Sequence, residues 1–227
     1  MPTKYRKAYQ LIVQQALFII GWSLLRPVFL LFLRPKIVYD AHFKYQGPYI
    51  VTPNHLSYLD SLCLGLLLPL RWGIYPINFV AEDFFFEIPF LGTLMRLLGA
   101  YPKRKGQGLQ KSLEAPLWCL KNNCSVIIFP QGWRRPTFDL KEGRKGAAAM
   151  AMESGRPILP IALFGIYDTS SWDFFLFRKK LVIMIGHPLE LKRNKGLLEE
   201  DAIAQTPKIM IEIDKLYRHA QEISKKN

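Results

Sequence analysis

Apolar and polar residues alternate differently in the two parts of the chain. Residues 8–33 are almost continuously apolar, which indicates a helical segment in contact with lipid or with a large apolar surface. From Lys36 onward, short apolar runs alternate with longer segments of mixed polarity. The short runs predict buried strands and the longer ones predict helices. This alternation is typical of an α/β domain.

The pattern predicts a mixed central sheet flanked by helices. The domain boundaries that follow from it are 1–35 for an N-terminal membrane-binding segment and 36–227 for the α/β domain. The expected strands are 37–39, 49–52, 77–81, 125–129, 158–164 and 181–186. The expected helices are 57–68, 88–98, 107–122, 143–154 and 201–224.

The N-terminal apolar segment is interrupted. A membrane-spanning helix needs about 20 consecutive apolar residues, and here Arg26 and Pro27 break the run. An arginine is costly at the bilayer centre, and proline breaks or kinks helices. We therefore expect a hairpin of two short helices, meeting at Arg26-Pro27 and buried partway in one leaflet. A hairpin packed on the protein's own core and a spanning helix are the alternatives. The residues expected to contact the membrane are Trp22, Arg26, Phe29 and Phe32.

The charge of the chain is strongly basic. There are 31 Lys and Arg residues against 18 Asp and Glu, for a net charge of +13. Such a balance points to an anionic partner. The basic residues that precede the first acid, Asp40, are interleaved with apolar runs, which favours an anionic phospholipid membrane. Nucleic-acid binders set basic residues among polar ones with exposed aromatics, so we expect no nucleic acid.

The cysteines and histidines indicate neither a metal site nor a disulfide framework. Cys63, Cys119 and Cys124 lack the spacing of either. They are typical of buried thiols in a reducing compartment. The apolar segment is not followed by a signal-peptide cleavage site, so we expect the cytoplasmic face of a cell membrane. No metal is expected.

A histidine and an aspartate five residues apart carry the sharpest chemical signal. On a regular helix His55 and Asp60 would lie roughly 140° apart and could not meet. Ser57 is a good N-cap with an acid three residues later, so it starts the helix and leaves His55 in the preceding loop. The spacing then permits a His–Asp couple in which the carboxylate fixes the tautomer and the free nitrogen takes a proton. Equally open is that Asp60 only completes a capping box.

Basic residues cluster at three places next to the expected elements. Arg134 follows an apolar strand, with Gln131 and Gly132 just before it. Ligands of open α/β sheets bind beyond the carboxyl ends of strands, and arginine grips phosphate in a bidentate way. Arg104 lies in a second basic loop, and Lys145 opens a helix whose N-terminus favours anions. For any one cluster, a solvated surface is the other explanation.

A series of short blocks extends this constellation over roughly residues 20–190. The blocks are Asn54-His55 with Asp60, Gly99 through Arg104, Phe129-Pro130-Gln131-Gly132-Trp133-Arg134, Lys145-Gly146, Pro157-Ile158-Leu159-Pro160-Ile161 and Ile185-Gly186-His187-Pro188. In this order and spacing the chain resembles the glycerolipid acyltransferases of the 1-acylglycerol-3-phosphate (lysophosphatidic acid) acyltransferase type.

The resemblance implies roles for these residues. It makes His55 and Asp60 the catalytic pair. The residues it assigns to the acceptor or its phosphate are Arg104, Gln131, Gly132, Arg134 and Lys145, and those that support the site are Asn54, Pro130 and Pro160. The sequence departs from the family in the third block, where Gln131 replaces a glutamate and Trp133 a threonine. Both changes put the acceptor in doubt.

The activity implied is acyl transfer from acyl-CoA or acyl-carrier protein to a hydroxyl of a lysophospholipid. His55 would be the general base, and no cofactor beyond the co-substrate is expected. Because of Gln131 and Trp133, the same transfer to a glycolipid, an ornithine-type lipid or a carotenoid glycoside stays open. A non-catalytic lipid-binding protein is the further alternative, against which the intact His–Asp pair argues.

Overall fold

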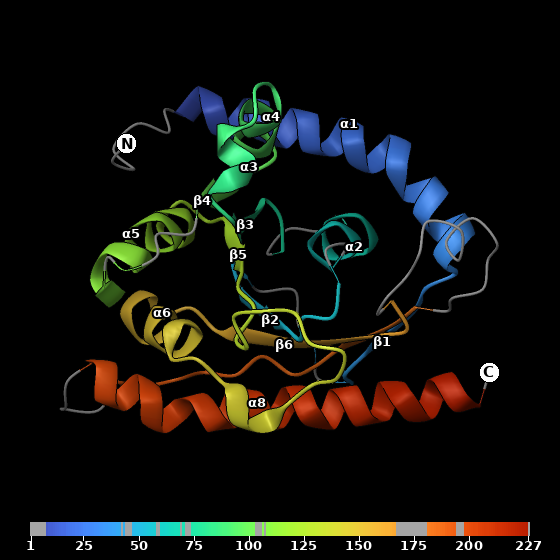
Figure 1. Ribbon diagram of the computed structural model, residues 1–227, viewed down its shortest axis with the longest axis vertical. Coiled ribbons are helices and arrows are strands. Elements are labelled where there is room, and N and C mark those ends of the chain that lie inside the picture. Colours follow the sequence, from blue (N-terminus) through green and yellow to red (C-terminus); the bar gives the residue numbers. More distant parts are fainter. Residues whose placement is uncertain are drawn as a thin grey trace.

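Seven strands form one sheet in the order β1-β7-β6-β2-β5-β3-β4 (Figure 1). The computed structural model of the chain describes residues 8–41, 43, 47–57, 60–68, 70, 74–102, 106, 108–166, 181–193 and 198–226. The strands are β1 (Lys36–Tyr39), β2 (Ile50–Pro53), β3 (Ile77–Ala81), β4 (Ala100–Pro102), β5 (Ser125–Ile127), β6 (Ile158–Phe164) and β7 (Val182–Ile185).

The sheet is mixed, as predicted. All neighbouring strands pair in parallel except β6 and β7, which are antiparallel. The carboxyl ends of β2, β5 and β3 therefore meet at one edge, where ligands of such sheets bind. The sequence analysis misses β4, because its three residues lie between a glycine and a basic loop and carry no alternation of their own.

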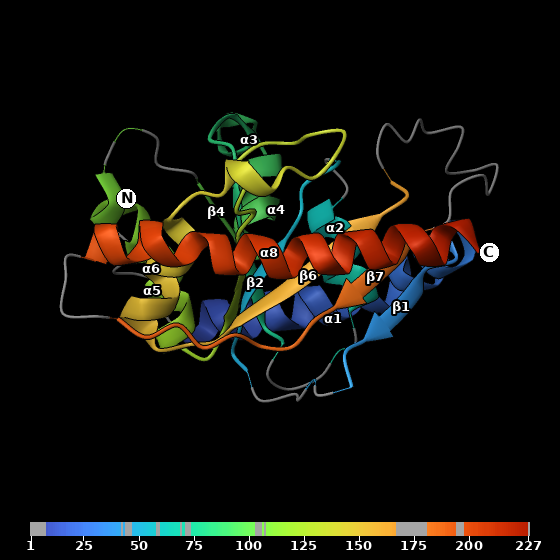
Figure 2. The same cartoon turned by 90° about the horizontal axis from the view of Figure 1, so that it is seen from below.

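Helices cover both faces of the sheet. One face carries α1 (Ala8–Leu33) and α2 (Asp60–Leu67), with α3 (Phe84–Glu87) and α4 (Leu91–Leu97) beside α1 (Figure 1). The other face carries α5 (Gly108–Lys121), α6 (Gly146–Ser154) and α8 (Leu198–Lys225), and α8 crosses β2, β6 and β7 (Figure 2). A short 3-10 helix, η2 (Leu140–Glu142), precedes α6.

Alternation along the central strands explains the two cores. Ile50 and Ile158 pack with α5, α6 and α8, whereas their neighbours Val51 and Leu159 pack with α1 and α2. Successive side chains of a strand point to opposite faces, so a continuous apolar run serves a strand that is buried on both sides. This is why the apolar strands are recognisable from the sequence.

The N-terminal segment is one helix, so the prediction of two helices meeting at Arg26-Pro27 is wrong. α1 runs through Pro27, which lies on its exposed side. The opposite side is tied to the domain: the Arg26 guanidinium donates to the backbone carbonyls of Leu66, Leu67 and Leu68 at 2.9, 3.0 and 3.2 Å. These are orphan carbonyls at the end of α2, which a cation stabilises well. Contacts on the buried side thus outweigh the local preference of proline.

The same contacts correct the expected membrane-contacting residues. Trp22 stacks under the Arg26 guanidinium at 4.5 Å and packs against the core, and Phe29 is buried in it. Phe32 is half-buried, and its role stays a prediction. The exposed apolar residues lie on the other side of the helix. They are Val13, Ile19, Ile20, Leu24, Leu25, Val28, Leu30 and Leu31.

By length and composition, the stretch Val13–Leu33 of α1 is long and apolar enough to cross a membrane. Only 11% of its most apolar window is buried inside the protein. A core helix of a soluble protein would be mostly buried, so α1 carries a large apolar face that the domain does not cover.

Candidate active site

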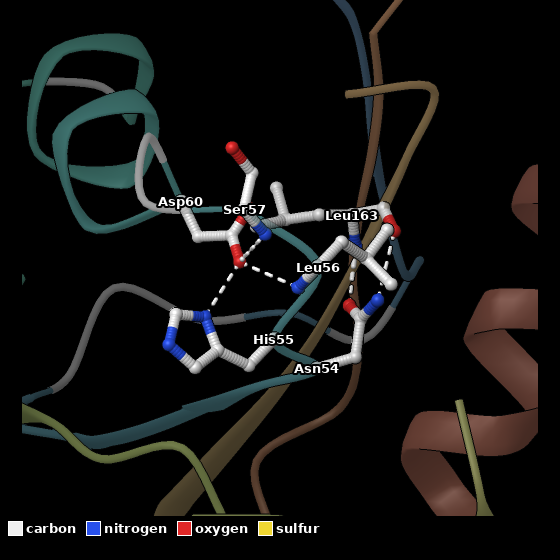
Figure 3. A network of polar contacts seen from close by, with 6 residues as sticks. All are labelled: Asn54, His55, Leu56, Ser57, Asp60 and Leu163. Atoms are coloured by element: carbon white, nitrogen blue, oxygen red, sulfur yellow. Dashed lines mark hydrogen bonds and ion pairs between the residues drawn. The ribbon is translucent and has the colours of Figure 1, made fainter. Parts of the chain in front are cut away.

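The loop after β2 is fixed by a buried asparagine. Asn54 is fully buried, and its Nδ2 donates to the carbonyl of Leu163 at 2.9 Å while the Leu163 N–H donates to Oδ1 at 2.7 Å (Figure 3). Both ends of the amide are therefore hydrogen-bonded to the backbone of β6. Asn54 clamps the loop to the sheet directly before His55.

His55 and Asp60 form the expected pair. Nδ1 of His55 lies 2.7 Å from Oδ2 of Asp60, and the same oxygen accepts hydrogen bonds from the backbone N–H groups of Leu56 (2.7 Å) and Ser57 (2.9 Å) (Figure 3). Asp60 begins α2, and its side chain reaches back over the loop. The carboxylate is thus the partner of the histidine. The predicted capping box with Ser57 as N-cap does not form, since α2 begins only at Asp60, but the same carboxylate bonds the backbone of the preceding loop.

The geometry defines the free nitrogen of His55. An ionised carboxylate only accepts hydrogen bonds, so Nδ1 carries the hydrogen in the neutral ring and Nε2 carries the lone pair. Nε2 points away from Asp60 (Figure 3). The His55 side chain is 19% exposed and that of Asp60 is fully buried. An imidazole held in this way can accept a proton from a group in contact with it.

A second segment, after β5, closes over the histidine. The Phe129 ring stacks on the His55 ring with centroids 3.8 Å apart, and the backbone N–H of Arg135 donates to the carbonyl of His55 at 2.9 Å. Between these contacts, the N–H of Gly132 donates to the carbonyl of Phe129 and closes a tight turn. The turn therefore lies against the His55–Asp60 pair.

Gln131, inside this turn, is fully buried, yet neither its Oε1 nor its Nε2 has a hydrogen-bond partner among the described residues. Buried polar atoms are nearly always paired, so an unpaired amide costs free energy and calls for an explanation. Asp60 also leaves its second oxygen, Oδ1, without a described partner. Unpaired polar atoms thus occur both in the His55–Asp60 pair and in the turn packed against it.

Gly132 has a backbone conformation that favours glycine, and the Arg144 side chain passes directly over it. It has a φ of 78°, and a Cβ there would lie 2.6 Å from Nε of Arg144. The Arg144 guanidinium stacks on the Trp133 ring, 4.1 Å from its centroid, and the Arg144 N–H donates to the carbonyl of Pro130 at 2.8 Å. The sequence marks a basic cluster at the start of this helix, but only the fold brings Arg144 to Trp133.

The other predicted cations have different surroundings. Lys145 pairs with Glu199 at the start of α8, and Arg134 is exposed. Arg104 lies outside the described residues. The roles of these three residues in binding phosphate stay predictions.

Two of the predicted supporting residues are buried prolines. Pro130 and Pro160 are buried, and the carbonyl of Pro160 on β6 accepts from Gly186 at 3.0 Å. Within the described ranges, no three His, Cys, Asp or Glu side chains lie together as a metal site would require. The expected absence of a metal stays a prediction.

The thiol nearest the site is not a nucleophile. Cys63, one turn after Asp60 on α2, is fully buried. Burial, and next the Asp60 carboxylate, raise the pKa of the Cys63 thiol far above its usual range. Because the thiolate is the reactive form of a cysteine, these surroundings disfavour Cys63 as a nucleophile.

Comparison with known proteins places the chain in a family of enzymes. Residues 34–164, more than half of the chain, match the family model described as Acyltransferase. The chain belongs to this acyltransferase family. The prediction of an acyltransferase is thereby confirmed, and the His–Asp pair lies inside the matched region.

Individual relatives agree with the family. The chain is 28% identical to the 1-acyl-sn-glycerol-3-phosphate acyltransferase of Bacillus subtilis over 156 residues, covering 68% of this chain and 73% of that one. It is 30% identical to the enzyme of that name from Saccharomyces cerevisiae over 144 residues, covering 61% of this chain and 46% of the relative. The chain thus spans less than half the length of the yeast relative.

A solved structure supports the fold. The crystal structure of the 1-acyl-sn-glycerophosphate (LPA) acyltransferase PlsC from Thermotoga maritima matches with a TM-score of 0.61 at 19% identity. The match covers 93% of this acyltransferase chain and 84% of that one. The predicted fold class is confirmed on these grounds.

Proposed function

We propose that this acyltransferase moves a fatty acyl group from an acyl thioester, on coenzyme A or a carrier protein, to a hydroxyl of a lysophospholipid such as 1-acylglycerol 3-phosphate. The observation that carries the proposal is the His55–Asp60 pair with Nε2 free to accept a proton. The names of the relatives support the acceptor class.

The reaction follows from the pair. Nε2 of His55 takes the proton of the acceptor hydroxyl as its oxygen attacks the thioester carbonyl carbon, so a C–O bond forms and a tetrahedral oxyanion develops. Asp60 stabilises the imidazolium through Nδ1. The oxyanion then collapses, the C–S bond breaks, and the thiolate leaves and takes the proton. The Gln131 amide or backbone N–H groups are the candidates for stabilising the oxyanion.

A second acceptor is favoured by one observation. Gln131 stands where the resembled family has glutamate, and its buried amide has no described partner. An amide donates as well as accepts, so it suits a neutral polar headgroup, such as the sugar of a glycolipid. Acyl transfer to such an acceptor is the second candidate.

One experiment separates these candidates. The purified protein is mixed with palmitoyl-CoA in micelles, and free thiol is followed with lysophosphatidic acid, a glycolipid acceptor or no acceptor, each beside Gln131→Glu. The proposal expects thiol release that depends on lysophosphatidic acid in the wild-type protein. Release with the glycolipid alone would favour the second acceptor. Lipid binding without any turnover would leave a non-catalytic lipid-binding protein.

We also place the protein on an anionic membrane, at its cytoplasmic face. The uncovered apolar face of α1 supports this, as do four exposed apolar residues on α3, on α4 and in the turn between them, next to α1. They are Phe84, Ile88, Phe90 and Leu94. Phe90 is 92% exposed, with a strained φ of 63°. Strain of this kind at a bulky, solvated residue points to a function, and an apolar surface of this extent suits a bilayer interface.

Vesicle flotation tests this placement. Changing Ile20, Leu24 and Leu31 together to serine should release the protein from vesicles that contain anionic lipid. The matched control changes Ile203 and Ile211, exposed isoleucines on α8, to serine. Equal flotation of both variants and the wild type would contradict the assignment to α1.

A further inference from the structure

Arg144 is held in an unusual way for an exposed arginine. Its backbone N–H is bonded to Pro130, its side chain crosses Gly132, and its guanidinium lies flat on Trp133. Stacking on an aromatic ring uses the face of the guanidinium and leaves its N–H groups free at the edge. A stacked arginine has already lost part of its side-chain freedom, so less is lost when it binds.

The charge of Arg144 is not neutralised. Two other cations in this part of the chain do have ion-pair partners: Arg135 is paired with Glu142, and Lys145 is paired with Glu199. No carboxylate in the described part of the chain lies within ion-pair distance of Arg144. Arg144 also comes directly before the uncapped N-terminus of α6, where the helix dipole adds positive potential.

The arginine belongs to the segment that touches the catalytic histidine. The turn on which it packs begins at Phe129, stacked on His55, and the chain returns to His55 at Arg135. The residue that replaces the glutamate of the resembled family in this turn, Gln131, is neutral. No acidic side chain of the turn therefore competes with an anion for Arg144.

We propose that Arg144, held in place by Trp133, binds the phosphate monoester of the acceptor lipid. This rests on the proposed function and deepens it: the site selects acceptors that carry a phosphate. Arg144 is a binding residue, and Trp133 is a positioning residue that acts through it. Guanidinium donors match phosphate oxygens in a bidentate way. An ammonium such as Lys145, engaged with Glu199, does not offer this geometry.

The test compares kinetic constants for lysophosphatidic acid and the uncharged 1-acylglycerol. Arg144→Gln should raise the KM for lysophosphatidic acid by roughly 10-fold or more, as expected for a lost charge-assisted contact. The kcat should change little, and kcat/KM for 1-acylglycerol should stay within about twofold. Arg193→Gln, which removes an exposed arginine paired with Glu153 on the surface, is the charge-matched control.

Trp133 supplies a second readout. Trp133→Thr should raise the KM for lysophosphatidic acid in the same direction as Arg144→Gln, and Trp133→Phe should restore it because the phenyl ring still offers a face to the guanidinium. In the double variant Arg144→Gln/Trp133→Thr, the tryptophan change should add nothing further. Additive losses, or no rescue by phenylalanine, would overturn the positioning role.

Two arms separate the phosphate of the acceptor from those of the donor. A raised KM for palmitoyl-CoA in Arg144→Gln, with the KM for lysophosphatidic acid unchanged, would overturn the assignment to the acceptor. Equal losses on both acceptors would overturn it as well. Binding of labelled lysophosphatidic acid in detergent, measured by gel filtration, tests the site without turnover. Arg144-dependent binding by a protein that transfers no acyl group would support the phosphate site and refute the proposed function.

Discussion

Two fully buried side-chain amides lie at the ends of neighbouring strands, and they differ in one respect. Asn54, after β2, has both ends of its amide bonded to the backbone of β6. Gln131, after β5, has a partner for neither within the part of the chain that the structure describes. The first is a structural clamp that fixes the catalytic loop. The second leaves its polar atoms unpaired in the turn packed against His55, and such atoms are available to bond a ligand.

The segments around the two amides also differ in how many of their polar groups are bonded within the protein. In the loop after β2, the polar groups of Asn54 and His55 and one oxygen of Asp60 are fixed by internal bonds. In the segment after β5, Arg144 stands without a carboxylate partner among the described residues. The proposal therefore assigns the chemistry to the first segment and substrate binding to the second.

The largest expected effect is on the first segment. Asp60→Asn removes the negative charge that stabilises the His55 imidazolium, while the amide oxygen still accepts the three hydrogen bonds of Oδ2. With a neutral partner Nε2 is a weaker base for the proton of the acceptor, and kcat should fall by roughly 10²-fold or more. Steady-state thiol release measures it. A loss of less than tenfold, with the fold intact by circular dichroism, would show that the pair is not catalytic.

Asn54→Leu should cost the next most. Leucine has nearly the same shape but leaves the N–H and the carbonyl of Leu163 buried without partners. We expect the free energy of unfolding to fall by roughly 2–5 kcal/mol, since each orphaned group costs about 1–3 kcal/mol. Urea denaturation checks it. An unchanged midpoint would mean that the clamp does not hold the loop.

Gln131→Met is the matched change in the second segment, and it should not lower the free energy of unfolding as Asn54→Leu does. Methionine fills a similar volume and carries no hydrogen-bonding groups. Removing an unpaired buried amide should leave the free energy of unfolding unchanged or raise it by about 1 kcal/mol. The same urea titration applies. A loss above about 1 kcal/mol would show that Gln131 is bonded in solution, and the comparison between the two amides would fail.

The smallest effect concerns the cysteines. Cys63 is buried and its pKa is raised, so little thiolate forms at pH 8. Cys119 and Cys124 are buried as well. Iodoacetamide should therefore modify the native protein at well under a tenth of the rate seen in urea, with mass spectrometry as the readout. Rapid alkylation of Cys63 in the native state would contradict the burial of its thiol.

Much of the fold could be predicted because it depends on local pattern. The buried strand β6 has the predicted bounds, 158–164, because a seven-residue apolar run is too short for a typical helix and suits a buried strand. The predicted helix 88–98 instead begins at Leu91, because Pro89 and Phe90 form a strained turn that the sequence does not mark. The helix expected from Ser57 begins at Asp60, whose side chain bonds the loop backbone.

The errors in the site come from contacts between distant segments. Arg26 is polar and flanked by apolar residues, which suggested a lipid headgroup, but its partners are carbonyls some 40 residues away at the end of α2. Likewise, Trp133 and Arg144 are separated by a loop and meet only in the folded chain. The His–Asp pair could be predicted because only five positions separate His55, in the loop, from Asp60, at the start of α2.

The most direct test of the central claim is thiol release from palmitoyl-CoA by wild-type protein and His55→Ala, with lysophosphatidic acid as acceptor. His55 is partly exposed and caps no helix, so its removal should leave the fold intact. The account predicts acceptor-dependent release in the wild type and a loss of at least about 10²-fold in the variant. A folded His55→Ala protein that transfers acyl groups at the wild-type rate would contradict it.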